Sequence, residues 1–160
     1  MAVDYFLKID GVPGESRDAK HKGEIELESF SWGATNEPGP GVGGGGGAGK
    51  VAIQDLHVVK RIDKASPRLF LACASGQHYK EAVLTARKAG QAQQEYLIIK
   101  LNDVVVTSFQ TGGSESSEMP HDSVSFDFGR IEVQYRPQKA DGSLDAAVKA
   151  GWDVKQNKKL

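Results

Sequence analysis

The chain contains little that would suggest covalent cross-linking, membrane insertion or binding to a polyanion. One residue of 160 is a cysteine, Cys73, which excludes an intrachain disulfide. No apolar run approaches the ~20 residues of a membrane span, and no basic segment followed by an apolar stretch forms a signal peptide at the N-terminus. Twenty Lys and Arg nearly balance 21 Asp and Glu, which argues against a general nucleic-acid binder. We expect a protein made in the cytoplasm, with no membrane insertion and no nucleic-acid partner, that could leave the cell only without a cleaved leader.

The excess of glycine is confined to one insert in a chain of single-domain length. Eight of the 19 glycines fall between Gly39 and Gly49, and the rest are spread at an ordinary frequency. We therefore predict one domain over residues 1–160, carrying an extended glycine-rich loop over residues 34–50.

Most of the remaining pattern is that of β-strands that change their inward face midway. In residues 24–32 the apolar positions pass from Ile25 and Leu27 to Phe30 and Trp32, which moves them to the other face of a flat strand. The same change occurs within residues 51–58, and again within residues 124–135 beside Gly129. Bulges or sharp bends absorb such changes, and closed sheets need them more than flat ones. The sequence predicts a mainly β fold, a single β-barrel of antiparallel strands.

One short helix is predicted beside this barrel. Ser66 is the expected N-cap, with Pro67 at the first helical position and Gly76 just after the end. The residues expected to share its apolar face are Leu69, Phe70, Cys73 and Ala74.

The other segments are assigned by their alternation and by turn residues. Residues 79–88 and 95–108 are predicted to form a hairpin, and residues 151–154 a short last strand. Residues 111–122 are polar and are predicted to be a loop, and residues 155–160 a frayed basic tail.

The run 44–50 resembles a phosphate-binding P-loop only superficially. Its eighth position should be Ser or Thr and is Val51. The motif should also open a helix, whereas the residues that follow alternate as a strand does. We interpret the run as a loop between two strands.

No group of residues predicts catalysis, a metal site or a cofactor. His21, His57, His78 and His121 have no second ligand at a recognised spacing and are expected at the surface or in turns. Cys73 is expected to be a small buried apolar residue, and no serine lies in a nucleophile-elbow context. Glu24, Glu26 and Glu28 alternate along one strand and are interpreted as its solvent side, or the side that meets a neighbouring subunit. An enzyme acting on cell-wall or nucleotide substrates would need a pocket of perturbed acids or bases that the sequence does not indicate.

An ordered series of segments resembles one known family, the haemolysin-coregulated proteins (Hcp) of bacterial type VI secretion. The segments that carry the resemblance are residues 3–11, 21–27, 31–33, 50–56, 62–67, 73–76, 87–90, 135–142 and 151–154. Together they cover nearly the whole chain in order, and the glycine-rich insert falls where the family has an extended loop.

The resemblance implies a β-barrel protomer with one flanking helix and no enzyme activity. It implies a homo-hexameric ring, stacking of rings into the inner tube inside a contractile sheath, and secretion of the tube with its spike and with effectors bound in the ring lumen. The alternative left open is a monomeric β-barrel carrier or binding module, whose apolar interior would hold a ligand.

Two sets of residues are candidates for contacts in such an assembly. The loop is predicted to dock on the next ring, with Asn36, Val42 and Lys50 as its candidate contact residues. Ser29 and Ser31 face away from Phe30 and Trp32 in an alternating strand, so they are candidates for the lumen and for effector binding.

Overall fold

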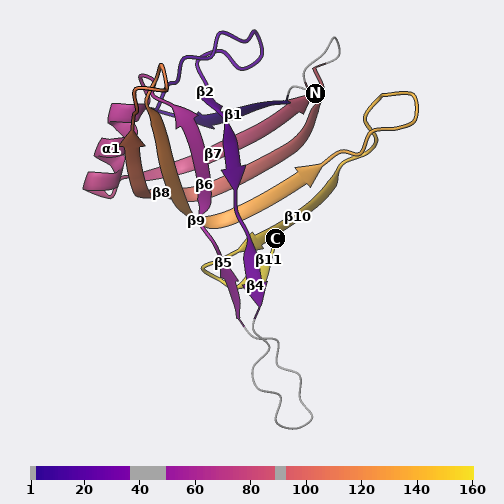
Figure 1. Cartoon of the computed structure of the whole chain (residues 1–160). Coiled ribbons are helices and arrows are strands. Elements are labelled where there is room, and N and C mark those ends of the chain that lie inside the picture. Colours follow the sequence, from indigo (N-terminus) through magenta and orange to yellow (C-terminus); the bar gives the residue numbers. More distant parts are fainter. Residues whose placement is uncertain (1–2, 37–49, 89–92) are drawn as a thin grey trace.

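The computed structural model describes residues 3–36, 50–88 and 93–160 and shows a curled antiparallel sheet with one helix at its side (Figure 1). In chain order the elements are β1 (Val3–Ile9), β2 (Ile25–Leu27), β3 (Ser29–Ser31), β4 (Ala34–Asn36), β5 (Val51–Ile53), β6 (Leu56–Arg61), α1 (Ser66–Ser75), β7 (His78–Lys88), β8 (Glu95–Gly112), β9 (His121–Tyr135), β10 (Val148–Asp153) and β11 (Lys158–Lys159). In the described part of the chain, no helix has the length and apolar character needed to cross a membrane.

Nine strands form the main sheet, and its centre is the long hairpin of β8 and β9. The hydrogen-bonded order is β11-β10-β9-β8-β7-β1-β2. Strand β9 pairs with β8 on one side and with two strands in succession on the other. Its residues 121–126 pair with β6, and its residues 130–135 pair with β10. All of these pairings are antiparallel, as predicted.

The sheet curls so far that two strands that follow each other in the chain, β2 and β3, pair with different parts of it. Only Glu28 separates β2, which pairs with β1, from β3, which pairs with β6. The Glu28 amide donates to the Val59 carbonyl at 2.8 Å, so the chain changes partner at this residue. Strands β2 and β3 meet end to end rather than side by side, and the single closed barrel expected from the sequence is not confirmed.

All three predicted changes in the inward-facing side of the chain are present, and each has a different structural cause. A break at Glu28 leaves Leu27 buried in β2 and Phe30 packed on the core from β3. Strands β5 and β6 belong to different sheets, since β5 pairs only with β4. Strand β9 runs unbroken through Gly129, and its buried positions shift from Phe128 to Ile131.

Helix α1 packs on β8 and contributes to the core through a face that differs from the predicted one. Leu69 and Ala72 are fully buried, whereas Phe70 is 58% exposed and its ring contacts that of Phe109 at a centroid distance of 6.1 Å. Both Leu69 with Ala72 and Phe70 with Ala74 have helical spacing, so the packing of α1 on β8, rather than spacing, decides that the first pair is buried and the second exposed.

Of the two predicted capping residues of α1, only the one at the C-terminal end is correct. Gly76 ends the helix in the left-handed conformation, with φ 68°, as predicted. The N-cap is Ala65 rather than Ser66, because the Ser66 side chain turns into the core and bonds to Lys60 and Asp122.

Three predicted loops or tails are partly strand. Residues 34–36 pair with residues 51–53 as the antiparallel β4–β5 ribbon, which projects from the body of the molecule (Figure 1). Strand β8 continues to Gly112 and β9 begins at His121, so the loop is residues 113–120. The tail is not frayed, because β11 pairs with β10.

Candidate functional site

Ser29 and Ser31 lie on the outer face of β3, as the alternation predicted. Both are exposed, while Phe30 between them packs edge-on against Tyr5, with ring centroids 5.2 Å apart. The two hydroxyls therefore share one surface, where they can form hydrogen bonds with another molecule without disturbing the core.

Asn36 and Lys50 flank the projecting end of the β4–β5 ribbon. Asn36 is paired with Val51 in the ribbon, and Lys50 is the exposed residue just before β5. Val42, the third candidate of this loop, lies outside the described residues, as does most of the run 44–50. Val51 opens a strand, as predicted, and not the helix that a P-loop requires.

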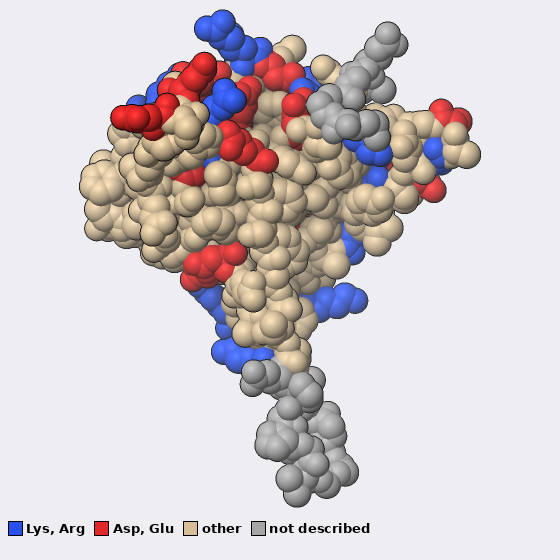
Figure 2. Space-filling model, in the orientation of Figure 1, with Lys and Arg blue, Asp and Glu red and all other residues tan. Residues whose placement is uncertain are grey.

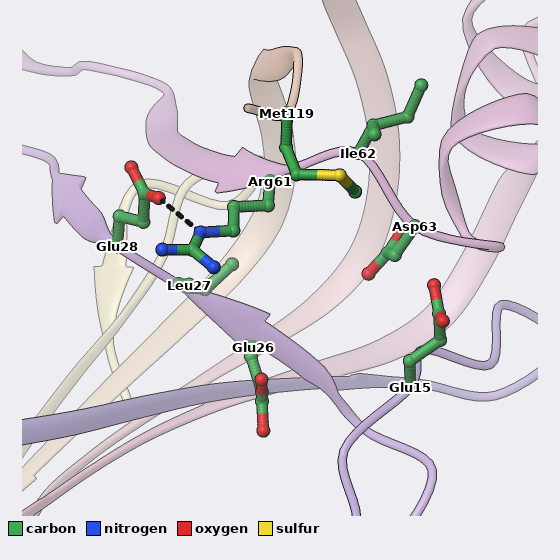
Figure 3. Close-up of a pocket in the computed structure, with 8 residues that line it drawn as sticks. All are labelled: Glu15, Glu26, Leu27, Glu28, Arg61, Ile62, Asp63 and Met119. Carbon is green, nitrogen blue, oxygen red and sulfur yellow. Dashed lines mark hydrogen bonds and ion pairs between the residues drawn. The ribbon is translucent and has the colours of Figure 1, made fainter. Parts of the chain in front are cut away.

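An open cavity of about 530 Å³ lies near the end of β6 (Figure 3). We call it the acidic cleft; its lining residues are Glu15, Glu26, Leu27, Glu28, Arg61, Ile62, Asp63 and Met119. The carboxylates of Glu15 and Asp63 lie near each other on one side of it, whereas Glu26 projects from β2 on the other side (Figure 3). Ile62 and Met119 are 37% and 43% exposed, so the cleft offers apolar as well as acidic surface.

The interactions inside the acidic cleft are those of a solvated surface. Arg61 Nε lies 3.4 Å from Glu28 Oε1, and His121 Nε2 lies 3.0 Å from the same oxygen. Glu15 accepts a hydrogen bond from the Lys64 amide at 2.9 Å. Exposed ion pairs of this kind contribute ~0–1 kcal/mol each, so they leave the carboxylates open to a partner.

A buried charge cluster ties β6, β9 and the start of α1 together. The Lys60 ammonium donates to Asp63 Oδ1 at 2.7 Å, to Ser66 Oγ at 2.9 Å and to Asp122 Oδ2 at 2.9 Å. Ser66 Oγ in turn donates to Asp122. Lys60 and Asp122 are both 0% exposed.

The cluster resembles the serine–lysine pair of some hydrolases, but its environment does not suit that chemistry. A general base must accept a proton from the serine, whereas Lys60 Nζ donates to Ser66 Oγ and to the carboxylates of Asp63 and Asp122. Burial by itself would raise the pKa of Asp122, but its hydrogen bonds from Ser66 and Lys60 outweigh burial and hold that pKa below the ordinary value. Ser66 is 3% exposed, so a substrate could not reach it. The arrangement holds elements together.

A second buried cation fixes the loop between β1 and β2. The Arg87 guanidinium donates to both oxygens of Asp18, at 2.8 and 2.9 Å, and to Asp4 at 3.2 Å. It also lies 4.9 Å from the centre of the Phe6 ring. The Arg87 hydrogen bonds hold the pKa of Asp18 well below its usual range.

His21 lies in the turn that precedes β2, as expected, because its carbonyl accepts a hydrogen bond from the Glu24 amide at 3.1 Å, and its side chain is buried. Its side chain stacks on Phe6, with ring centroids 4.4 Å apart, and its nitrogens lie 2.8 Å from Glu24 and 2.6 Å from Glu95. Glu24 therefore faces His21 and is not on the solvent side with Glu26 and Glu28. His57 and His121 are half-buried and His78 is exposed.

Cys73 is half-buried against the core, less enclosed than expected. Across the described segments, no group of three or more His, Cys, Asp or Glu is arranged to hold a metal ion.

The sequence analysis missed the buried charges, although a signal for them was present. Lys60 continues the inward phase of Leu56 and Val58, and Asp122 that of Val124 and Phe126. A cation and an anion at core positions of two strands indicate a buried pair when those strands are neighbours, as β6 and β9 are.

Comparison with known proteins shows the same family along the whole chain. Residues 6–135 match the model of the family described as "Type VI secretion system effector, Hcp". The chain is 50% identical over 159 residues to Protein hcp1 of Pseudomonas aeruginosa, covering 98% of each.

Solved structures show the same fold. One is a type six secretion system protein, 33% identical, with a TM-score of 0.93 over 99% of this chain and 100% of the other. Another is Hcp1 from Salmonella typhimurium, 37% identical, with a TM-score of 0.80 over 100% of both chains. The chain belongs to the Hcp family of type VI secretion proteins.

Proposed function

We propose that this chain is the structural subunit of a type VI inner tube, assembling as hexameric rings that stack and are secreted. The observation that carries the proposal is the match to a type VI family protein, 50% identical over 98% of both chains. On this proposal the protein acts by assembly rather than by catalysis, and the curled sheet serves as the barrel wall of each protomer.

The surface of the protomer supports assembly. On the outer side of α1 the residues Phe70 and Leu71 are 58% and 61% exposed. A helix that is apolar on both sides is normally covered by protein. The face around α1 is largely free of charge in Figure 2. A head-to-tail interface between copies covers such a surface in every subunit and closes into a ring when the rotation allows.

We assign the stacking of rings to the loop that the β4–β5 ribbon carries, with Asn36, Val42 and Lys50 as its contact residues. Pairing of Asn36 with Val51 gives this loop a rigid base that projects from the sheet (Figure 1). A ribbon that projects from the sheet is placed to reach another molecule (Figure 1).

We assign effector binding to the surface of β3 that carries Ser29 and Ser31. Both hydroxyls are exposed and can donate and accept hydrogen bonds. The proposed partners are neighbouring copies of the chain, effectors, and the spike and sheath proteins of the secretion machine.

The monomeric carrier is not favoured, because the interior of the sheet is filled. Large side chains such as Leu7, Ile25 and Phe126 are at most 1% exposed and pack against one another. A carrier needs an apolar cavity at this place.

The test of the proposed function is the mass of the native protein in solution. Light scattering after size exclusion, with negative-stain images of the same peak, should show a particle of six chains with a central hole. A monomer at working concentration would contradict the proposal.

A further inference from the structure

The acidic cleft presents four carboxylates and one guanidinium, from Glu15, Glu26, Glu28, Asp63 and Arg61, around exposed apolar side chains. One of the carboxylates is unused within the chain: in the described residues, the Glu26 side chain makes no hydrogen bond or ion pair. Glu28 and Asp63 are engaged with Arg61 and Lys60, so they contribute to the field but are not free. The cleft is therefore a concave surface of net negative charge that can accept a basic segment.

The last residues of the same chain form such a basic segment. Residues 155–160 include Lys155, Lys158 and Lys159 and no acidic residue. Lys155 is paired with Asp103, and Lys158 lies close enough to Asp153 to lower its pKa. The Lys159 side chain makes no hydrogen bond or ion pair within the described residues. Leu160 follows it and is 49% exposed, so the segment also presents an apolar side chain.

Within one molecule these two surfaces are too far apart to meet. The acidic cleft adjoins β9 near His121, which pairs with Arg61. The basic segment adjoins β9 near Arg130, which pairs with Asp153, the partner of Lys158. Nine residues of strand separate these positions, which corresponds to about 30 Å along β9. The basic segment can therefore contact an acidic cleft only in another molecule.

The two surfaces also lie toward opposite ends of the protomer. The cleft lies at the end of β6, where Arg61 pairs with His121, away from the β4–β5 ribbon, while the C-terminus and β11 lie toward the ribbon (Figure 1). In Figure 2 red and blue side chains lie together along the upper edge, and blue side chains lie on both sides of the base of the ribbon. The acidic cleft and the basic segment lie toward opposite ends of the protomer, although neither end carries charge of one sign alone.

We propose that the acidic cleft of one copy receives the basic segment 155–160 of a second copy in the adjacent ring. This inference rests on the proposed function and names a contact surface for the stacking step that is separate from the glycine-rich loop. Lys159 approaches Glu26, and Leu160 covers the apolar rim made by Ile62 and Met119. Adjacent rings stack end to end in the same way along the whole tube. Each interface between two rings therefore contains one such contact per subunit, and the contributions of these contacts to stacking add.

A cysteine pair tests the contact directly. The chain carrying Glu26→Cys and Lys159→Cys, with Cys73→Ser to remove the native thiol, is oxidised at low concentration and analysed on a denaturing gel. Because the two positions are too distant to bridge within one chain, a ladder of covalently linked chains is expected. Cross-linking traps brief contacts, so the result does not require long tubes. The matched control places the second cysteine at Lys139, an exposed residue of the loop before β10, and should give at least tenfold less product.

Charge reversal supplies a second readout that distinguishes this inference from the proposed function. Glu26→Lys and Lys159→Glu should each leave the ring mass unchanged and lower the fraction of stacked rings at least tenfold. The two changes together should restore stacking, because the pair is reversed in every junction. Rings of normal mass that do not form the cross-link, or single variants that stack as the parent does, would overturn the contact alone. A monomeric parent protein would overturn the ring proposal and this contact with it.

Discussion

Lys60 and Asp122 lie directly opposite each other in the β6–β9 ladder, 2.9 Å apart and without solvent exposure. Ser66, at the start of α1, bonds to both of them. The pair therefore joins two strands and the only helix of the described residues at one point in the core.

Removing the cation from this pair should destabilise the fold strongly. Lys60→Met leaves the Asp122 carboxylate buried without its counter-ion, and the free energy of unfolding should fall by about 3–5 kcal/mol. Urea unfolding followed by tryptophan fluorescence measures the change. Arg61→Met, which removes an exposed pair with Glu28, is the matched control and should cost less than about 1 kcal/mol. A Lys60→Met protein as stable as the control would show that the buried pair contributes little.

The same pair predicts how stability responds to acid. The pKa of Asp122 is lowered in the folded protein by Ser66 and Lys60, against the opposing effect of burial. A lowered pKa means that the carboxylate stabilises the fold above its unfolded pKa of about 3.9, and that this contribution is lost as the pH falls through the folded pKa. The parent protein and Asp122→Asn should differ most near neutral pH, and the difference should shrink below about pH 4. Unfolding curves at a series of pH values measure it, and a constant difference over that range would contradict the assignment.

Gly14 should tolerate no side chain. A Cβ placed there would lie 2.4 Å from the Glu24 carbonyl oxygen and 2.6 Å from the Ile25 Cα, both backbone atoms that cannot move alone. Gly14→Ala should therefore lower the free energy of unfolding by about 1–3 kcal/mol. Gly112→Ala is the control, because its Cβ would meet nothing within 4 Å and should change stability little. Equal stability of the two variants in thermal unfolding would rule out the close approach.

Shortening the glycine-rich loop should separate stacking from ring formation. Deletion of residues 43–47 lies beyond the β4–β5 ribbon, so the paired residues Asn36 and Val51 stay in place. Rings should keep their mass in light scattering, while negative-stain images should show fewer and shorter stacks. Tubes as long as those of the parent would exclude a docking role for these residues.

Enlarging Ser31 should affect effector binding and leave folding intact. Ser31→Gln adds a longer polar side chain on an exposed face of β3, away from Phe30 and the core. The unfolding midpoint should stay within the range of ordinary surface substitutions, about ±0.5 kcal/mol, while retention of a bound effector in a pull-down should fall. Thr107→Gln, also exposed but on β8, is the control for a general surface effect, and full effector retention by Ser31→Gln would count against the lumen assignment.

Local patterns in the sequence identified most elements and their faces. Alternation placed Phe30 toward the core and Ser29 and Ser31 outside, because successive side chains of a strand point to opposite faces. Gly76 ended the helix as predicted, since a left-handed residue there favours glycine. The changes of face in three segments predicted bends, and the structure has a bend or a change of partner at each.

Other features depended on residues that are distant in the chain. Ser66 satisfies the requirements of an N-cap locally, yet its hydroxyl is used by Lys60 and Asp122, and Asp122 is 56 residues away. His21 has no metal ligand at a recognised spacing, but folding brings Glu95 to its ring across 74 residues. The fraying predicted for the tail was wrong for the same reason, because β11 finds a partner in β10.

The sequence by itself determined the strand alternation, the helix and its C-terminal end, the near balance of charge and the family resemblance. These are properties of short segments, or of segments taken in order along the chain. Only the tertiary structure decided which strands are neighbours, which charges are buried in pairs and which lie free at opposite ends of the protomer. Pairing of β6 with β9 buries Lys60 against Asp122, whereas the length of β9 keeps the acidic cleft away from the basic segment. The register of hydrogen bonds between strands that are distant in the chain sets both the contact of Lys60 with Asp122 and the separation of the cleft from the segment. No short segment of sequence determines that register.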